Sequence, residues 1–222
     1  MNTFPSSDRL VEAYGLMRTG ILCMLVTAIM LIAGLMGLLV SFLWLVPPGR
    51  ERVGVLPSIP STVLFTAHFI AFILVLLVGA IIALIGLWGK LLPGMRVLKE
   101  VQPDFSTAET LVKLGYFWGL ILLVVSIPLV SFSLIIGVFT GIIAAVLMLI
   151  GYIGLIILCF KLKELEREDL YLIAGVLLII GIFFSIAVVI ALILLYIALG
   201  NSIEKRRRGQ VPAPTPPLLP PV

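Results

Sequence analysis

Charged residues are scarce in this sequence. Of the 222 residues, 62% are hydrophobic and only 12% are charged, and the mean hydropathy is +1.29. A soluble domain carries about 25% charged residues, so this chain could not cover a water-facing core with polar surface. The composition therefore excludes a soluble globular protein and predicts an integral membrane protein.

Histidine and cysteine are also nearly absent, with one histidine and two cysteines in the whole chain. Bis-histidine haem ligation needs a second histidine, and a zinc site needs more ligands than two cysteines supply. A disulfide between Cys23 and Cys159 is not expected, because each is a single thiol in an apolar segment. The sequence contains no catalytic constellation, so we expect no enzyme activity, no cofactor and no metal site.

Four tracts contain no Asp, Glu, Lys or Arg: residues 20–49, 53–89, 114–160 and 170–203. A membrane-spanning helix needs about 20 apolar residues, so these tracts predict an all-α, polytopic bundle of transmembrane helices. Prolines bound the first two tracts, which gives spans near 20–46 and 62–90. Together with the later tracts, these spans form a transmembrane domain over 20–203.

The third tract is too long for one span. As a single helix it would extend about 70 Å, more than twice the roughly 30 Å hydrocarbon core of a bilayer. A proline and three serines gather between Ser126 and Ser133, which predicts a turn between spans near 108–128 and 134–161. Ser106 and Glu109 form a capping box that predicts where this third helix starts.

The last tract, 170–203, is long for one tilted span and short for two. We expect a single span near 169–200, which gives about five spanning helices. The alternative is a re-entrant hairpin with Gly181 and Ser185 near its tip, which would give six membrane segments. Two legs of about 15 residues each would be too short to cross fully.

Both ends of the chain are expected to lie outside the hydrocarbon core. Residues 1–19 read as an N-terminal interfacial segment, because apolar residues recur there at helical spacing. Residues 204–222 form a tail that is first basic and then rich in proline, a composition typical of disorder. The basic cluster is expected to contact lipid headgroups; its members are Lys205, Arg206, Arg207 and Arg208.

Residues 161–169 contain a mixture of acidic and basic residues. The signs alternate at three- and four-residue spacing, which predicts that the fourth helix extends into water with local ion pairs.

The distribution of Lys and Arg predicts the orientation. With five spans, nine of them lie on the side of the N-terminus and six on the other side; a re-entrant last tract changes the count to thirteen against two. Basic residues accumulate on the cytoplasmic side, so the N-terminus is predicted to face the cytoplasm, with the chain in the cell membrane. The basic excess is assigned to topology and to the lipid bilayer, and no nucleic-acid partner is expected.

Small residues recur at four-residue spacing in three of the predicted spans, which lets helix backbones approach closely. These candidate helix-packing residues are Ala33, Gly37, Gly79, Ala83, Gly137, Gly141 and Ala145. Packing within one chain is the expected use, and self-association through the fourth span into a homo-oligomer is the alternative. Thr66 and His68, in the second span, form a candidate polar membrane site, although a lone histidine more often serves packing.

The position of the acidic residues bears on function. All eleven lie in predicted loops or ends, which disfavours ion-coupled transport, because coupled transporters keep ionisable residues at membrane depth. The sequence therefore predicts a non-catalytic accessory or scaffold protein, with a membrane-protein complex as its setting. The alternative is a passive channel or uncoupled carrier lined by Thr27, Ser41, Thr66, His68, Ser126, Ser133 and Thr140.

Three segments resemble a known group of sequences. They are Tyr14–Gly20 before the first span, Gly151–Ile156 near the end of the fourth span, and Leu170–Gly181 in the last tract. Through them the chain resembles a family of uncharacterised archaeal, mainly crenarchaeal, multi-pass membrane proteins, a domain of unknown function. The resemblance implies an archaeal source and supplies no catalytic residues. Family members often interrupt the last tract with Pro or Asn, and this chain does not, which disfavours the re-entrant alternative.

Overall fold

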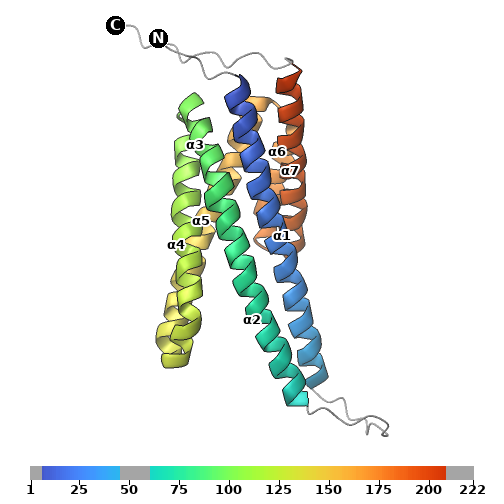
Figure 1. Cartoon of the computed structure of the whole chain (residues 1–222), viewed down its shortest axis with the longest axis vertical. Coiled ribbons are helices and arrows are strands. Elements are labelled where there is room, and N and C mark those ends of the chain that lie inside the picture. Colours follow the sequence, from blue (N-terminus) through green and yellow to red (C-terminus); the bar gives the residue numbers. More distant parts are fainter. Residues whose placement is uncertain (1–6, 46–60, 209–222) are drawn as a thin grey trace.

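Helices and the short turns between them make up the part of the chain that the computed structural model describes, residues 7–45 and 61–208, and this part contains no strand (Figure 1). Its elements are α1 (Ser7–Leu45), α2 (Ser61–Gly86), the π-helical turn η1 (Leu87–Leu91), α3 (Leu92–Val101), α4 (Phe105–Phe132), α5 (Leu134–Glu166), α6 (Asp169–Gly181) and α7 (Ser185–Arg207). The predicted loop at the prolines of 47–60, the proline-rich part of the tail and residues 1–6 lie outside the described residues.

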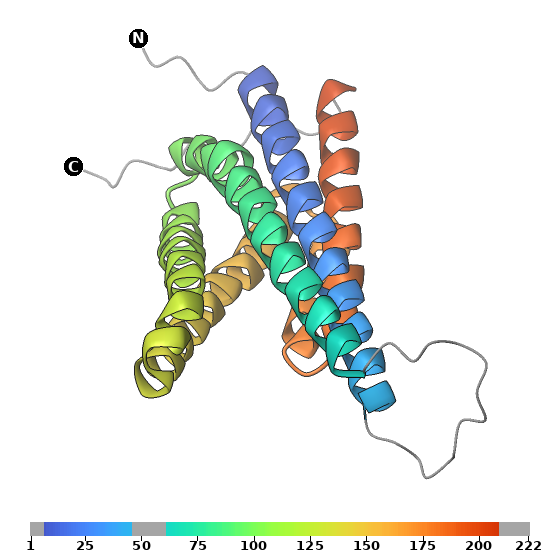
Figure 2. The ribbon, with the colours of Figure 1, turned by 60° about the horizontal axis from the view of Figure 1, so that its bottom comes forward.

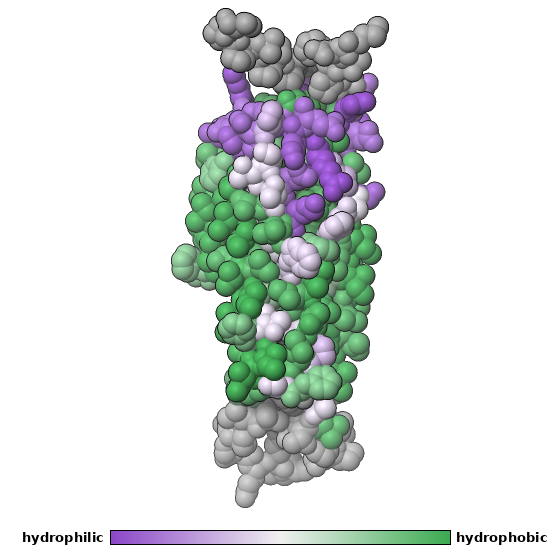
Figure 3. Space-filling view, turned by 90° about the vertical axis from the view of Figure 1, so that its left-hand side faces the viewer, coloured by the Kyte–Doolittle hydropathy of each residue, from purple (hydrophilic) through white to green (hydrophobic). Residues whose placement is uncertain are grey.

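Within the described residues, five helices are long and apolar enough to cross a membrane, which confirms the predicted all-α bundle and its number of long helices. They cover Asp8–Leu43, Thr66–Val101, Phe105–Val130, Leu134–Glu166 and Ser185–Arg207. Helix α6 is shorter. Charged side chains gather at the end where α1 begins, and the rest of the visible surface is apolar (Figure 3). We call the charged end the polar end.

The helices are arranged as two antiparallel pairs joined by a hairpin. Helix α1 pairs with α2, and α4 pairs with α5. The hairpin of α6 and α7 connects the pairs, because α6 packs on α5 and α7 packs on α1. Figure 2 shows the two pairs diverging with distance from the polar end. The hairpin therefore holds the pairs together only in the half of the bundle near that end.

The last tract corrects the prediction of a single helix over 169–200. Helix α6 ends at Gly181 and α7 begins at Ser185, so the chain reverses where the hairpin alternative placed its tip. At the base of the hairpin, the Tyr171 hydroxyl lies 2.8 Å from the Ser202 hydroxyl. The start of α6 and the end of α7 thus lie together at the polar end, as the hairpin alternative expected.

The tract reverses without a proline or an asparagine, and Gly181, at the end of α6, packs closely against other helices. A Cβ placed on Gly181 would lie 2.6 Å from a Val188 methyl group and 2.7 Å from the Tyr152 hydroxyl. That hydroxyl donates a hydrogen bond of 2.6 Å to the Leu178 carbonyl. Only glycine allows α7 and the tyrosine of α5 to come this near to the end of α6.

The second span is longer than predicted, because Pro93 does not close it. Proline cannot donate the i→i−4 hydrogen bond of an α-helix. The missing bond is accommodated in η1, where the Leu92 N–H donates to the Leu87 carbonyl. A π-helical turn of this kind inserts one residue without ending the helix. Helix α3 then continues to Val101 with its charged residues outward and Leu92, Met95 and Leu98 buried.

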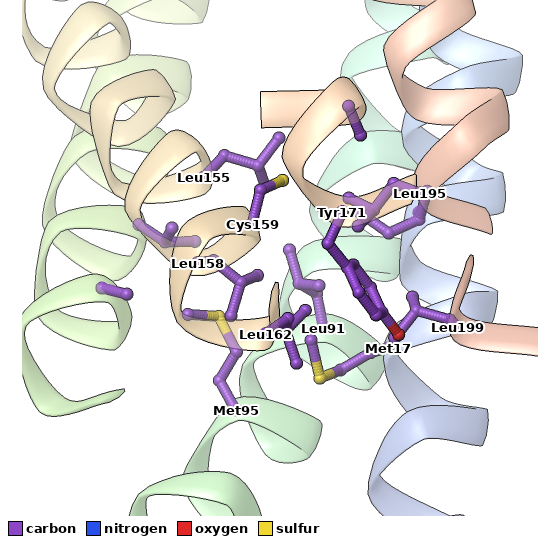
Figure 4. Close-up of a cluster of buried hydrophobic side chains, with 14 of the residues drawn as sticks. Met17, Leu91, Met95, Leu155, Leu158, Cys159, Leu162, Tyr171, Leu195 and Leu199 are labelled. Carbon is purple, nitrogen blue, oxygen red and sulfur yellow. The ribbon is translucent and has the colours of Figure 1, made fainter. Parts of the chain in front are cut away.

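Residues 7–19 continue α1 without a break and do not form a separate interfacial segment. Leu10, Tyr14 and Met17 are completely or almost completely buried. They belong to a core that lies near the polar end and that also contains Leu91, Cys159 and Leu199 (Figure 4). The apolar residues that recur at helical spacing in the N-terminal segment thus pack against other helices rather than against the membrane surface.

The predicted turn between the third and fourth spans is confirmed at a slightly later position. Ser133 alone links α4 to α5, with an extended backbone at φ −156° and ψ 117°, and Pro128 lies inside α4 rather than at the turn. A Cβ on Gly137 would lie 2.5 Å from the Val130 backbone nitrogen. This glycine lets two long helices meet directly after a one-residue connection.

The small residues predicted to pack helices together differ in what they contact. Gly79 packs on Thr27, Gly137 packs on Val130, and a Cβ on Gly141 would be in ordinary contact with Ser126. Ala83 and Ala145 line a cavity, whereas Ala33 is exposed and a Cβ on Gly37 would meet nothing within 4 Å. Packing between α1 and α2 uses the neighbouring Gly34, whose Cβ would lie 2.9 Å from Phe72.

The closest helix contact involves glycines that the sequence analysis did not single out. A Cβ on Gly115 of α4 would lie 2.0 Å from the Gly151 nitrogen of α5, and one on Gly119 would lie 3.0 Å from the Met148 nitrogen. Gly115 and Gly119 form a GxxxG motif, which is the signal that could have identified them.

Replacing Gly115 with Ala tests this contact. The added methyl group has to push two backbones apart, and we expect a loss of about 1–3 kcal/mol of stability, as for other overpacked cores. Unfolding in mixed micelles, followed by circular dichroism, measures the change. Gly37→Ala is the control, since open space surrounds that position, and it should gain about 0.5–1 kcal/mol from helix propensity. Equal effects of the two substitutions would contradict the assignment.

Candidate functional site

A buried ion pair lies at the polar end, where α5 turns into α6. The Glu166 carboxylate oxygen Oε1 accepts hydrogen bonds from the Tyr14 hydroxyl at 2.5 Å and from Arg206 Nε at 2.9 Å, and it also pairs with Arg206 Nη2. The side chain of Glu166 is 0% exposed and that of Arg206 is 4% exposed. Helices α1, α5 and α7 therefore meet at one carboxylate.

A second acidic residue extends these contacts across the hairpin. Glu168 accepts hydrogen bonds from Asn201 Nδ2 at 2.8 Å and from Lys205 Nζ at 2.7 Å. Between the two acids, Arg167 has a left-handed backbone with φ 52° and ψ 37°, a conformation that is uncommon outside glycine. The left-handed conformation of Arg167 reverses the chain within one residue, so the carboxylates of Glu166 and Glu168 are both held against α7. We call Tyr14, Glu166, Glu168, Asn201, Lys205 and Arg206 the hairpin cluster.

The hairpin cluster corrects two predictions. Segment 161–169 does contain a local ion pair, Lys161 with Glu164 at 2.9 Å, but Glu166 and Glu168 pair across the bundle rather than along their helix. The Arg206 guanidinium lies inside the protein, so it is not available to lipid headgroups. Headgroup contact remains a prediction for Arg207, which is exposed, and for Lys205 and Arg208, which pair with Glu168 and Glu204.

The predicted capping box also has a different role. Helix α4 begins at Phe105, one residue before Ser106, and its N-cap residue Asp104 makes no side-chain capping bond. Glu109 is 7% exposed and lies 3.1 Å from Lys99 Nζ and 3.5 Å from Arg96 Nε of α3. The carboxylate thus fixes the amphipathic α3 against α4 at the polar end.

Arg18 occupies the boundary between the hairpin cluster and the apolar part of the bundle. Its guanidinium carbon lies 4.2 Å from the centre of the Tyr196 ring, within the range of a cation–π contact. A Cβ on Gly200 would lie 3.3 Å from the same carbon. Glycine at this position gives the guanidinium room to lie across α7.

A cavity of about 470 Å³ lies on the far side of the core from the hairpin cluster. It is bounded by α1, α2, α4 and α5, and the tip of the hairpin closes it toward the polar end. Its lining is almost wholly apolar: Met24, Thr27, Ala28, Leu31, Leu76, Ala80, Ala83, Leu87, Tyr116, Leu120, Leu123, Ala145, Met148, Leu149, Tyr152, Leu155, Leu178, Gly181, Ile182, Val188 and Leu192. Ala83 and Ala145, two of the predicted packing residues, face this space.

Most of the hydroxyl groups predicted to line a channel are bonded to backbone carbonyls. Ser41, Ser126 and Thr140 donate to carbonyls of their own helices, at 2.7–2.9 Å. Thr27 contacts its own helix and the Gly79 carbonyl of α2, at 3.0 and 3.2 Å. Of the seven predicted lining residues, only Thr27 borders the cavity. Thr66 and His68 lie on an exposed part of α2, so the structure does not place the candidate polar site at the cavity.

The described residues contain no group of three or more side chains suited to holding a metal ion. Cys23 and Cys159 are free thiols, and Cys159 is buried in the core near the polar end. The described geometry thus comprises ionic contacts between helices at one end and a hydrocarbon-lined space in the middle.

A family model described as "Protein of unknown function (DUF973)" matches residues 11–222. The chain belongs to this family. The match includes the hairpin cluster, the cavity and both helix pairs, so the family comprises the whole bundle except the first turn of α1. No curated protein and no solved structure matches the chain.

Removing the charge of Glu166 tests the hairpin cluster. Glu166→Gln leaves the buried Arg206 without a counter-charge, and breaking a buried pair in this way costs about 3–5 kcal/mol. The matched control is Glu164→Gln, two residues away, whose side chain is 60% exposed; losing such a surface pair costs about 0–1 kcal/mol. Denaturant unfolding in micelles measures both, and a similar small loss in each would show that the buried pair does not hold the hairpin.

Proposed function

We propose that this protein is a non-catalytic accessory or scaffold subunit that binds another membrane protein within the bilayer. The observation that carries the proposal is the use of its polar groups. The described acidic side chains of the hairpin cluster and Glu109 bind basic side chains of the same chain, and hydroxyls at depth bind backbone carbonyls. Such groups stabilise a rigid framework and leave little polar chemistry for a substrate.

The passive channel or uncoupled carrier is the less favoured function. A channel needs several polar side chains around one wet passage, and the hydroxyls of Ser41, Ser126 and Thr140 are instead dispersed among separate helices. The cavity is bordered by apolar side chains rather than by these groups.

An exposed face of small residues on α1 supports the proposal that a partner helix binds there. Ala33 is exposed, and open space surrounds Gly37 one helical turn later. Small residues let helices approach closely where lipid removes the hydrophobic drive for association. Self-association through residues 137–145 of α5 is less favoured, because Gly137 already packs against Val130 of the same chain. We therefore assign the partner to the Ala33–Gly37 face.

Replacing Gly37 with Leu tests the accessory role. We expect the native protein, extracted from its own membranes in mild detergent, to run as a stoichiometric complex in native mass spectrometry. Gly37→Leu should dissociate that complex, because the larger side chain blocks close approach. Gly89→Leu, at another open glycine, should leave the complex intact. A wild-type protein that remains monomeric, and that makes vesicles permeable to small solutes, would overturn the proposal.

We further propose that the protein lies in the cell membrane, in an archaeal source as the resemblance implies, with both the N-terminus and the end of α7 in the cytoplasm. Thirteen of the fifteen Lys and Arg residues belong to segments at the polar end or follow α7 in sequence, whereas Arg50 and Arg52 lie between α1 and α2. Basic residues accumulate on the cytoplasmic side, and the contacts of α7 with the start of α6 at the polar end support a shared side for the basic cluster and the majority.

Cysteine accessibility tests this orientation. In a background where Ser replaces Cys23 and Cys159, cysteines at Glu204 and at Glu100 should both react only with an impermeant maleimide supplied from the cytoplasmic side, since both positions are exposed at the polar end. A cysteine at Glu51, between α1 and α2, is expected to react only from outside. Labelling of positions 204 and 100 from opposite sides would refute the shared location.

A further inference from the structure

We propose that the apolar cavity is a binding site for a hydrocarbon chain of a membrane lipid. The cavity lies between the α1/α2 pair and the α4/α5 pair, directly beyond the tip of the hairpin, where Gly181, Ile182 and Val188 border it. All four helices of the two pairs contribute to its wall, so it is a built space rather than one exposed helix face.

The short hairpin creates this space at membrane depth. Arg18 and Gly200 place α1 and α7 side by side near the polar end. From that level α1 extends about 40 Å to Leu45, whereas α7 reaches back only about 22 Å to Ser185, at 1.5 Å per residue. The hairpin therefore stops well short of the far ends of the two pairs. Beyond its tip, no protein segment among the described residues separates the pairs.

The lining selects an apolar occupant. Of its three hydroxyl-bearing residues, Thr27 is bonded to two backbone carbonyls and Tyr152 to the Leu178 carbonyl. The Tyr116 hydroxyl has no hydrogen bond within the described part of the chain, and it is the single polar contact that the lining can offer. Water needs two to four polar partners to occupy a buried site, so the cavity excludes water and favours hydrocarbon.

The position of the cavity among long apolar helices identifies the source of that hydrocarbon. A volume of about 470 Å³ falls within the roughly 300–1,000 Å³ typical of small-molecule sites. The wall is formed by the apolar segments of helices long enough to cross the bilayer, so lipid chains surround the cavity at high concentration. An empty space of this size would leave the apolar side chains that line it without packing contacts. A lipid chain restores those contacts without any polar recognition.

Photolabelling in nanodiscs tests the assignment. The protein is placed in phosphatidylcholine discs that contain a small fraction of the same lipid with a diazirine on one acyl chain, and labelled peptides are mapped by mass spectrometry. We expect labels at the cavity residues Leu123 and Met148 as well as at Ile135 and Phe139, which are exposed outside it. The double substitution Ala83→Leu and Ala145→Leu fills the cavity and should reduce the cavity labels about tenfold through steric exclusion.

The outer labels serve as the internal standard, and Ala71→Leu is the matched control, because Ala71 is exposed on α2 and does not line the cavity. Its cavity labels should equal those of the wild type. Each single Leu variant should show a partial loss, which keeps the test valid if the double variant does not fold. Absence of cavity labels from the wild type, or their persistence in the filled variants, would overturn the proposal. Neither result bears on the Ala33–Gly37 face, so this test is separate from that of the accessory role.

Discussion

The buried pair of Glu166 and Arg206 fixes how the last two helices lie in the bundle. A carboxylate removed from water is tolerated only when it is paired and hydrogen-bonded, and here the Arg206 guanidinium and the Tyr14 hydroxyl supply the partners. These partners come from the first and last described helices, so the end of α7 is held beside the start of α1. The two ends of the described chain consequently lie together at the polar end.

This constraint divides the bundle into two halves. Near the polar end, residues of α1, η1, α3, α4, α5, α6 and α7 form a continuous core in which Tyr14, Leu91 and Tyr171 are fully buried. Beyond the hairpin tip, the described residues comprise the two long pairs, and these diverge. Each pair is held separately by close glycine contacts, such as Gly115 with Gly151 and Gly34 with Phe72. The cavity is the space that results from joining two self-sufficient pairs at one end only.

The same division underlies both proposals about function. The ion pairs of the described residues lie at the polar end, and the hydroxyls of Ser41, Ser126 and Thr140 are bonded to backbone carbonyls. Beyond the hairpin tip, Ala33 is exposed, open space surrounds Gly37, and the cavity lining is almost wholly apolar. In the proposed functions, an accessory subunit that retains a lipid chain would use this half of the bundle for both contacts.

The sequence by itself determined the membrane class, the helical fold, the turn near Ser133 and the confinement of charge to the ends, because each follows from local composition and from the fixed rise of a helix. The prediction of a single span over residues 169–200 was wrong, because the close contacts of Gly181 at the reversal are made with Tyr152 of α5 and Val188 of α7, which local sequence does not reveal. Helical periodicity also could not show that Gly34, rather than Ala33 or Gly37, packs against α2. The charge pattern predicted that Glu166 and Glu168 face water, although both are buried in ion pairs. Only the tertiary structure decided these points, because a carboxylate or a glycine acquires its role from the helix that is packed against it.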